Sequence, residues 1–160
     1  MMNHALMFSS KSDEWETPQD LFDTLHAEFD FQIDLAATSA NRKCQKWLEK
    51  GDDALAYPWH VHANRGWLNP PYSRGLCAKF IAKAAEERRQ GFLTVMLLPA
   101  RTDTKAFHTH IYDASNGQAR DGVEIRFLPG RLKFGGAKHG APFPSMIVVF
   151  RPTVVAEVSA

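Results

Sequence analysis

Residues 92–98 form an unbroken run of apolar residues around one threonine, bounded by Gly91 and Pro99. A run of this kind is typical of a strand buried on both faces, and such strands occur mainly in parallel sheets that helices cover on both sides. Gly91 is expected to end a preceding helix, and Pro99 is expected to end the strand. The run therefore predicts a central strand in an α/β layered protein.

Helix and strand signals alternate on either side of this run. Thr17 followed by Pro18 predicts a helix start, with Thr17 as the N-cap and Pro18 at the first helical position. Thr102 or Asp103 is expected to cap another helix that runs through Tyr112. A helix is also expected over 76–89, and strands are expected at 31–37, 66–69, 123–128 and 146–150. The alternation predicts a mostly parallel sheet whose last pair of strands is antiparallel.

The totals fit a single globular domain. The 160 residues are 44% hydrophobic and 23% charged, with a formal net charge of +1 and two cysteines. This balance disfavours a strong non-specific nucleic-acid binder, and no apolar run is long enough to cross a bilayer. We expect a flexible leader over residues 1–14, one domain over 15–152 and a tail over 153–160. Because no export signal is readable, the expected location is the cytoplasm, with reduced thiols.

A proline pair follows the strand expected at 66–69. The segment Asn69-Pro70-Pro71-Tyr72 cannot be helical, because its prolines remove two backbone N–H donors and leave carbonyl groups without partners. The Asn69 carboxamide oxygen can accept hydrogen bonds, and the Tyr72 ring offers a flat apolar face. Together these groups suit the binding of a planar amine. For the two prolines alone, an ordinary proline-rich turn is the alternative.

Polar or small residues follow three of the expected strands. These residues are Asp34–Ala37, Asn69–Tyr72 and Pro99–Asp103. In open α/β sheets, ligands bind in the crevice beyond the C-terminal ends of the strands. We therefore expect these three segments to form one composite site at that edge of the sheet.

Several segments of the chain resemble the small phage and prophage DNA N-6-adenine methyltransferases. They are Trp15–Pro18 with Leu21 and Phe22, Phe31–Ala37, Asn69–Arg74, Met96–Thr104, and Arg131–Lys138 through Pro142–Ser145. The resemblance extends over about residues 13–152. It implies a compact, Rossmann-like sheet of the S-adenosylmethionine-dependent methyltransferases, mostly parallel with an antiparallel C-terminal strand. It also implies a cytoplasmic enzyme, encoded by a phage or prophage in a bacterial host.

The resemblance implies a catalytic role for Asn69, Pro70, Pro71 and Tyr72. The Asn69 oxygen and the Pro70 carbonyl would accept hydrogen bonds from the adenine amino group, and Tyr72 would stack on the base. This amine is a poor nucleophile because its lone pair is delocalised, and two acceptors favour its pyramidalisation as positive charge develops. The adenine must leave the duplex to reach such a pocket, so the implied partner is double-stranded DNA. No metal is required.

The resemblance also implies the contacts to S-adenosylmethionine. The Thr17 hydroxyl or a backbone N–H at the helix start would meet the methionine carboxylate of the cofactor. Asp53 would accept a hydrogen bond from the adenine amino group of the cofactor, although a turn aspartate bonded to its own backbone is an equal alternative. Asp34–Ala37 stands where related enzymes carry a Gly-x-Gly loop, which this chain lacks. The implied cofactor-binding residues are Trp15, Thr17, Pro18, Asp34, Ala36, Ala37 and Asp53.

The segment Arg131–Lys138 interleaves basic residues with Phe134 and two glycines. This pattern suits a phosphate backbone beside a stacked base, and a solvated β-hairpin loop is the alternative. The resemblance implies that an aromatic ring of this region lies against the flipped adenine, with Phe134 as the first candidate and Phe143 in reserve. The expected nucleic-acid contacts are Arg74, Arg101, Lys105, Arg131, Lys133, Phe134 and Lys138.

The motif Asn69–Tyr72 suits any planar amine, so rival functions stay open. One rival is a methyltransferase acting on an RNA base or a protein glutamine, and another is a non-catalytic DNA-binding relative. The basic aromatic segment favours a nucleic acid, and the intact motif favours catalysis. Histidines spaced two apart do not share a helical face, so no metal site is expected. The sequence is compatible with a monomer or a homodimer, and with a role in restriction protection or in regulation.

Overall fold

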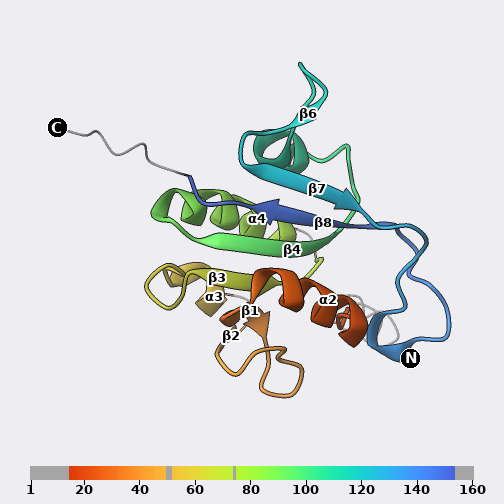
Figure 1. Ribbon diagram of the computed structural model, residues 1–160. Helices are drawn as coiled ribbons and strands as arrows, with labels where there is room; N and C mark the ends of the chain where they lie inside the picture. The colour runs from red at the N-terminus through yellow and green to blue at the C-terminus, as the bar shows by residue number, and fades with distance from the viewer. Residues whose placement is uncertain (1–14, 50–51, 74, 154–160) are drawn as a thin grey trace.

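The computed structural model describes residues 15–49, 52–73 and 75–153, except for the side chains of Asp52 and Asp53. Six strands form one sheet in the order β2-β1-β3-β4-β8-β7 (Figure 1). The neighbours from β2 to β4 are parallel, whereas β8 is antiparallel to both β4 and β7. This confirms the expected α/β fold. The strands are β1 (Ile33–Ala37), β2 (Trp47–Glu49), β3 (Arg65–Leu68), β4 (Leu93–Pro99), β7 (Val123–Phe127) and β8 (Ser145–Phe150).

The apolar run forms β4, which lies between β3 and β8. Its side chains alternate between two cores, with Val95 and Leu97 on one face of the sheet and Met96 and Leu98 on the other. All four are at most 1% exposed. Full burial of each such side chain contributes roughly 1.5–3 kcal/mol, so both faces of this strand favour apolar residues, and Thr94 is the one polar residue in the run.

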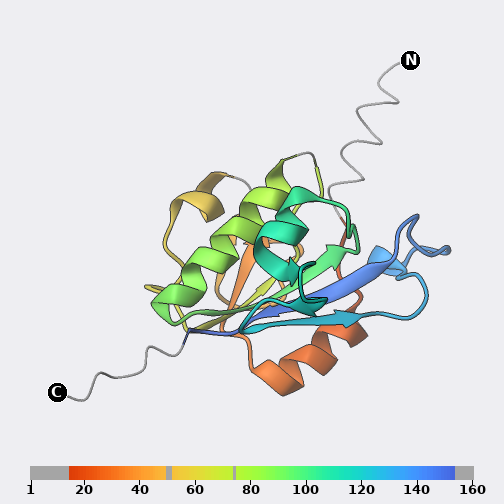
Figure 2. The same ribbon diagram turned by 90° about the horizontal axis from the view of Figure 1, so that it is seen from above.

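Helices cover both faces of the sheet (Figure 2). On one face, α2 (Gln19–Phe29) buries Phe22, Leu25 and Phe29, which recur on one side of the helix. On the opposite face lies α4 (Leu76–Glu87), which η1 (Arg88–Gln90) extends. The expected helices on both sides of a central sheet are therefore present.

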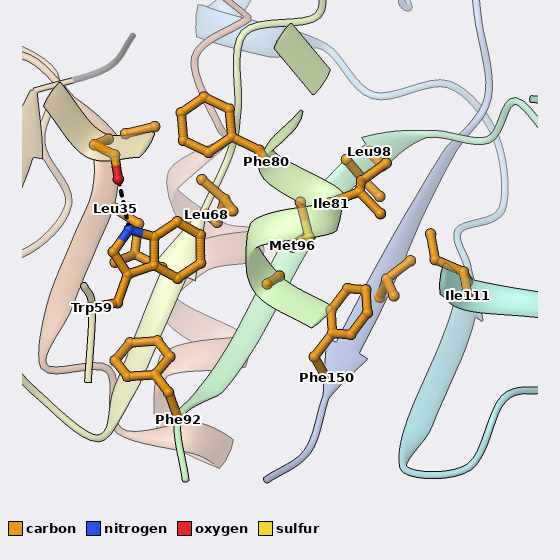
Figure 3. Packing of buried hydrophobic residues seen from close by; sticks show 14 of the residues in the cluster. Leu35, Trp59, Leu68, Phe80, Ile81, Phe92, Met96, Leu98, Ile111 and Phe150 are labelled. Carbon is orange, nitrogen blue, oxygen red and sulfur yellow. Dashed lines mark hydrogen bonds between the residues drawn. The ribbon is translucent and has the colours of Figure 1, made fainter. Parts of the chain in front are cut away.

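The core beneath α4 is the larger of the two and is shown in Figure 3. Phe80 and Ile81 of α4 pack there with side chains of the sheet. The short helix α3 (Asp52–Ala56) contacts α4, and the Trp59 indole N–H donates a 2.9 Å hydrogen bond to the Ala54 carbonyl. That bond satisfies the polar atom of a ring that is fully buried.

The start of α2 differs from the prediction. The helix begins at Gln19 with Pro18 as its N-cap and has no side-chain cap, so the prediction of Thr17 as the N-cap is wrong. The Thr17 hydroxyl accepts a hydrogen bond from Asn69 instead. A tertiary contact has therefore replaced the local cap.

The region after β4 also differs from the prediction. The helix expected through Tyr112 is reduced to a short π-helical segment, η2 (Phe107–Ile111). Its N-cap is Ala106 and it has no side-chain cap, so the prediction of a cap at Thr102 or Asp103 is wrong. The Thr104 hydroxyl accepts a 3.3 Å hydrogen bond from the backbone N–H of Phe107.

Short elements also lie between the longer strands. A small hairpin of β5 (Tyr112–Asp113) and β6 (Gln118–Ala119) precedes β7, and η3 (Phe134–Gly136) lies between β7 and β8. No helix within the described ranges is both long and apolar enough to span a membrane. The expected leader over residues 1–14 and most of the expected tail, residues 154–160, lie outside the described residues.

Candidate active site

The C-terminal ends of β1 and β3 border a narrow cavity together with the segment that precedes α2. Its volume is about 40 Å³, which is room for a few non-hydrogen atoms. The structure therefore brings two of the three expected strand ends together. The end of β4 does not line this cavity. The lining residues are Trp15, Glu16, Thr17, Asp34, Ala36, Asn41, Lys43, Trp67, Asn69 and Pro71.

The Asn69 carboxamide is held firmly at one end and left unpaired at the other. Its Nδ2 donates hydrogen bonds to the Trp15 carbonyl, at 2.5 Å, and to Thr17 Oγ1, at 3.0 Å. Its Oδ1 is buried and accepts no hydrogen bond from any described residue. A buried acceptor without a donor costs about 1–3 kcal/mol, so such an atom in a cavity is a place where a ligand donor is expected.

Asp34 shapes the other side of the cavity through its backbone contacts. Its carboxylate is 3% exposed and accepts hydrogen bonds from the backbone N–H groups of Ala36, at 3.3 Å, and Lys43, at 2.9 Å. Burial raises the pKa of Asp34 to about 6, although the two N–H donors act in the opposite direction. The carboxylate therefore fastens the segment after β1 to the strand.

Lys43 brings a positive charge to the cavity that sequence reasoning missed. Its side chain is 10% exposed, and its Nζ lies 2.9 Å from Gln19 Oε1 and 3.9 Å from Glu16 Oε1. Asn41 and Trp67 also line the cavity and were not predicted. Residues 42–59 show no regular periodicity, so the only signal for Lys43 was its position shortly after a predicted strand end.

Four rings pack against one another close to Asn69, and we call them the aromatic cluster: Trp15, Tyr72, Phe134 and Phe143. Trp15 meets Phe134 and Phe143 edge-on, with ring centroids 5.3 and 5.2 Å apart. Tyr72 meets Phe143 in the same manner at 5.7 Å. Edge-on pairs contribute roughly 0.5–1.5 kcal/mol each beyond the burial of area, so the cluster ties the segment before α2 and the segment between β7 and β8 to the Asn69–Tyr72 motif.

Within the aromatic cluster, Tyr72 and Phe134 are buried, at 8% and 6% exposure, whereas Phe143 is half-buried. The Tyr72 hydroxyl donates a 3.1 Å hydrogen bond to the Leu97 carbonyl. Burial raises the pKa of Tyr72 well above its ordinary value, so the phenol stays neutral. Phe143, the reserve candidate for a contact with the base, is therefore the more accessible ring.

The segment between β7 and β8 lies beside the start of α2 (Figure 1), where the backbone N–H of Gly135 donates a 2.9 Å hydrogen bond to the Glu16 carbonyl. Arg101, from the end of β4, stands 6.0 Å from the Phe143 ring centroid. This segment is thus fixed to both the N-terminal segment and the end of β4. We call five exposed basic residues of these two regions the basic rim: Arg101, Lys105, Arg131, Lys133 and Lys138.

Several of the residues predicted from the resemblance do not line the cavity, and Pro70 is one of them, although it is buried between Asn69 and Pro71. Pro18 borders a separate groove with Arg131 and Lys133 rather than the cavity, and Ala37 is buried within β1. Arg74 and the side chain of Asp53 lie outside the described residues. Their expected contacts stay predictions.

A second cavity, of about 160 Å³, lies between the end of β4, α4 and η2, and Tyr72 forms part of its wall. Arg101 and Cys77 also line it. Burial raises the pKa of the Cys77 thiol to about 11, so the thiol is protonated and unreactive at neutral pH. Across the described ranges, no group of three His, Cys, Asp or Glu side chains is placed to hold a metal ion.

Comparison with known proteins gave matches of two kinds. Among curated proteins, the chain is 33% identical to the DNA N-6-adenine-methyltransferase of Escherichia phage T1 over 96 residues, which make up 59% of this chain and 39% of that protein. It is 26% identical to the DNA N-6-adenine-methyltransferase of Haemophilus phage HP1 (strain HP1c1) over 155 residues, which make up 95% of this chain and 86% of that protein. The chain thus spans less than half the length of the first relative and most of the second.

No solved structure matches the chain significantly. The sequence model of one protein family, described as DNA N-6-adenine-methyltransferase (Dam), matches residues 5–159. That match includes nearly the whole chain and confirms the resemblance drawn from the motifs. This protein belongs to the DNA N-6-adenine-methyltransferase (Dam) family.

Proposed function

We propose that this protein transfers a methyl group from S-adenosylmethionine to the N6 amino group of an adenine that is flipped out of double-stranded DNA. The family and the two phage relatives support adenine in DNA as the target. One structural observation carries the proposal. Asn69, in the wall of the cavity, keeps a buried carboxamide oxygen that has no hydrogen-bond donor among the described residues.

The amino group of adenine offers two N–H donors to the Asn69–Tyr72 segment. Asn69 Oδ1 would accept one, and the Pro70 carbonyl would accept the other. As the amine attacks, positive charge develops on its nitrogen, and two fixed acceptors stabilise that charge more than they stabilise the neutral amine. When bound, S-adenosylmethionine supplies the electrophilic methyl group.

The residues of the cavity fit one end of a methyl donor. Ala36 leaves room at the end of β1, Lys43 offers a cation to a carboxylate, and Thr17 offers a hydroxyl. Since the cavity itself holds only a few atoms, the remainder of the donor would extend along the open strand ends, where Glu49 terminates β2. Contacts from Pro18, Ala37 and Asp53 are part of the proposal but rest on the family resemblance alone.

The basic rim and the aromatic cluster would meet the DNA. Their charges suit phosphates on either side of an extruded nucleotide, and a base stacked on an aromatic ring gains roughly 1–3 kcal/mol. Because Tyr72 is 8% exposed and Phe143 packs against it, a base that stacks on Tyr72 would have to displace Phe143. Extruding the base costs a few kcal/mol, which these contacts would offset.

Transfer of labelled methyl groups tests the proposal. Wild-type protein, unmethylated DNA and methyl-labelled S-adenosylmethionine are expected to yield N6-methyladenine after digestion to nucleosides. Asn69→Ala should lower the rate by about 10²-fold or more, as for the loss of a transition-state hydrogen bond. Asn64→Ala is the matched control, because Asn64 is exposed and precedes β3 at the opposite end of the sheet.

Two results would contradict the proposal. If the label enters RNA or protein but not DNA, then DNA is not the substrate. Full activity in Asn69→Ala would show that Asn69 takes no part in the reaction. If the wild-type protein does methylate DNA, digestion of that DNA with methylation-sensitive nucleases would identify the target sequence.

A further inference from the structure

The orientation of the Asn69 carboxamide is dictated by an acceptor that cannot donate. A backbone carbonyl only accepts hydrogen bonds, so the group that faces the Trp15 carbonyl must be the NH₂ end of the amide. The oxygen end is thereby turned to the side that has no protein donor. The direction in which Asn69 Oδ1 points is thus determined by the Trp15 carbonyl as well as by the position of Asn69 in the chain.

Thr17 supplies the second contact that holds this orientation. Its hydroxyl lies 3.0 Å from Asn69 Nδ2, and the residue is 4% exposed. The residue stands where a helix N-cap is expected, yet it bonds to no backbone N–H of α2. The hydroxyl therefore bonds to Asn69 and does not cap α2, although such a cap would ordinarily stabilise the helix by about 1 kcal/mol.

We propose that Thr17 is a positioning residue for the methyl-transfer reaction: it holds the Asn69 amide so that Oδ1 is presented to the target amine. The inference rests on the proposed function for its catalytic consequence, but the Thr17–Asn69 contact is open to measurement without any reaction. This role differs from the contact with the cofactor carboxylate that the family resemblance implies for Thr17.

The proposal also links the two substrates. A hydroxyl that accepts from Asn69 still has its own hydrogen to donate, and that hydrogen has no acceptor among the described residues. Because Thr17 lines the cavity, a carboxylate or carbonyl of a bound donor would accept it. Hydrogen bonds in such a chain strengthen one another, so a filled donor site would tighten the hold on Asn69.

The kinetic test compares Thr17→Val, which keeps the shape and removes the hydroxyl, with Thr17→Ser, which keeps the hydroxyl. With the donor saturating, Thr17→Val should lower kcat about tenfold, as expected for one lost hydrogen bond of about 1.4 kcal/mol, and loss of the contact with the bound donor should raise KM for the donor as well. Thr17→Ser should restore kcat to within about twofold of wild type. A raised KM with an unchanged kcat in Thr17→Val would overturn the positioning role and leave a cofactor contact.

The activity-independent test observes the side-chain amide of Asn69 by ¹⁵N NMR, with Asn69→Ala to assign its signal. In the wild type, both NH₂ protons should exchange with solvent much more slowly than those of the exposed Asn64. In Thr17→Val, exchange of one proton should accelerate and its chemical shift should move, while Thr17→Ser should resemble wild type. If the Asn69 signals are the same in Thr17→Val as in wild type, the inference fails.

These two measurements separate the inference from the proposed function. If wild-type protein methylates no DNA but exchange of the Asn69 amide protons changes in Thr17→Val, the proposed function is wrong and the Thr17–Asn69 contact is confirmed. If Thr17→Val does not fold, the wild-type spectrum decides, since Asn69 protons that exchange as fast as those of Asn64 would overturn the proposal.

Discussion

The hydroxyl of Tyr72 is bound to the backbone carbonyl of Leu97, 3.1 Å away, so the ring of the motif is anchored to the central strand of the sheet. This separates two roles within one side chain. The hydroxyl anchors the ring, whereas the ring is the part that would contact a base.

Tyr72→Phe should therefore lose stability but keep activity. Removal of the hydroxyl leaves the Leu97 carbonyl without this donor and should lower the free energy of unfolding by about 1 kcal/mol. The rate of methyl transfer should stay within about threefold of wild type, whereas Tyr72→Ala should lose at least about tenfold in kcat/KM through the lost stacking. Urea denaturation and methyl-transfer assays measure the two effects, and a Phe variant as inactive as the Ala variant would assign the hydroxyl to the reaction.

The ionisation of Asp34 should give stability a defined pH dependence. Burial raises its folded pKa to about 6 from 3.8, so protonation favours the folded state. The contribution of Asp34 is thus greatest below about pH 4 and is lost as the pH rises through 6. A shift of about two pKa units corresponds to about 3 kcal/mol.

Asp34→Asn removes this titration and is the reference for it. The free energy of unfolding of wild type minus that of Asp34→Asn should fall by about 2.4 kcal/mol between pH 4 and pH 7. Urea denaturation at several pH values gives this difference. A difference that is constant over the window, or that grows with pH, would show that the hydrogen bonds from Ala36 and Lys43 outweigh the burial.

The basic rim should determine how DNA binding depends on salt. Lys133→Ala removes one phosphate contact and should reduce the slope of log K against log salt concentration by about 0.9. Lys46→Ala is the matched control, because Lys46 precedes β2 at the other end of the sheet and its ammonium donates to the His62 carbonyl. Binding measured by fluorescence anisotropy at several salt concentrations checks this, and equal slopes for both variants would remove Lys133 from the DNA contact.

Gly66 permits the close packing of β3 against its neighbours. A Cβ at this position would lie 2.7 Å from Leu35 Cδ1 and 2.9 Å from Phe92 Cζ, both on fully buried side chains. Gly66→Ala should therefore lower the free energy of unfolding by about 1–3 kcal/mol.

A double-mutant cycle with Leu35→Val tests the cause. Valine lacks the δ carbons that the new methyl group would meet, so the double variant should be more stable than the sum of the single effects predicts, by about 0.5 kcal/mol or more. Additive effects would mean that Leu35 is not the obstacle.

The sequence predicted the parts of the fold that depend on local patterns. The run 92–98 identified the central strand because burial on both faces makes it apolar except for Thr94, and the proline pair fixed Asn69 at a strand end. The sequence predicts the aromatic cluster only in part, because it offers Phe134 and Phe143 as separate candidates, while the structure packs both against Trp15 and Tyr72.

The predictions that failed depend on contacts between distant residues. Thr17 has the local features of an N-cap, yet its hydroxyl accepts a hydrogen bond from Asn69, which lies 52 positions away in the sequence. Lys43 enters the cavity because Asp34 binds its backbone, and no periodic pattern marks that loop. A site formed at strand ends is assembled from such contacts, so local propensities identify its residues only where a motif such as Asn69–Tyr72 fixes the backbone.

The position of β8 has a consequence for how the protein is made. This strand follows β7 in sequence but lies between β4 and β7 in the sheet, and both of its edges are paired. A ribosome-bound chain that has not yet released residues 145–150 therefore holds β4 and β7 with open edges, which invite pairing with other chains. The protein should thus reach its native state only after synthesis of this strand, through slow, non-local pairing, and overproduction should favour aggregation of the unfinished chain.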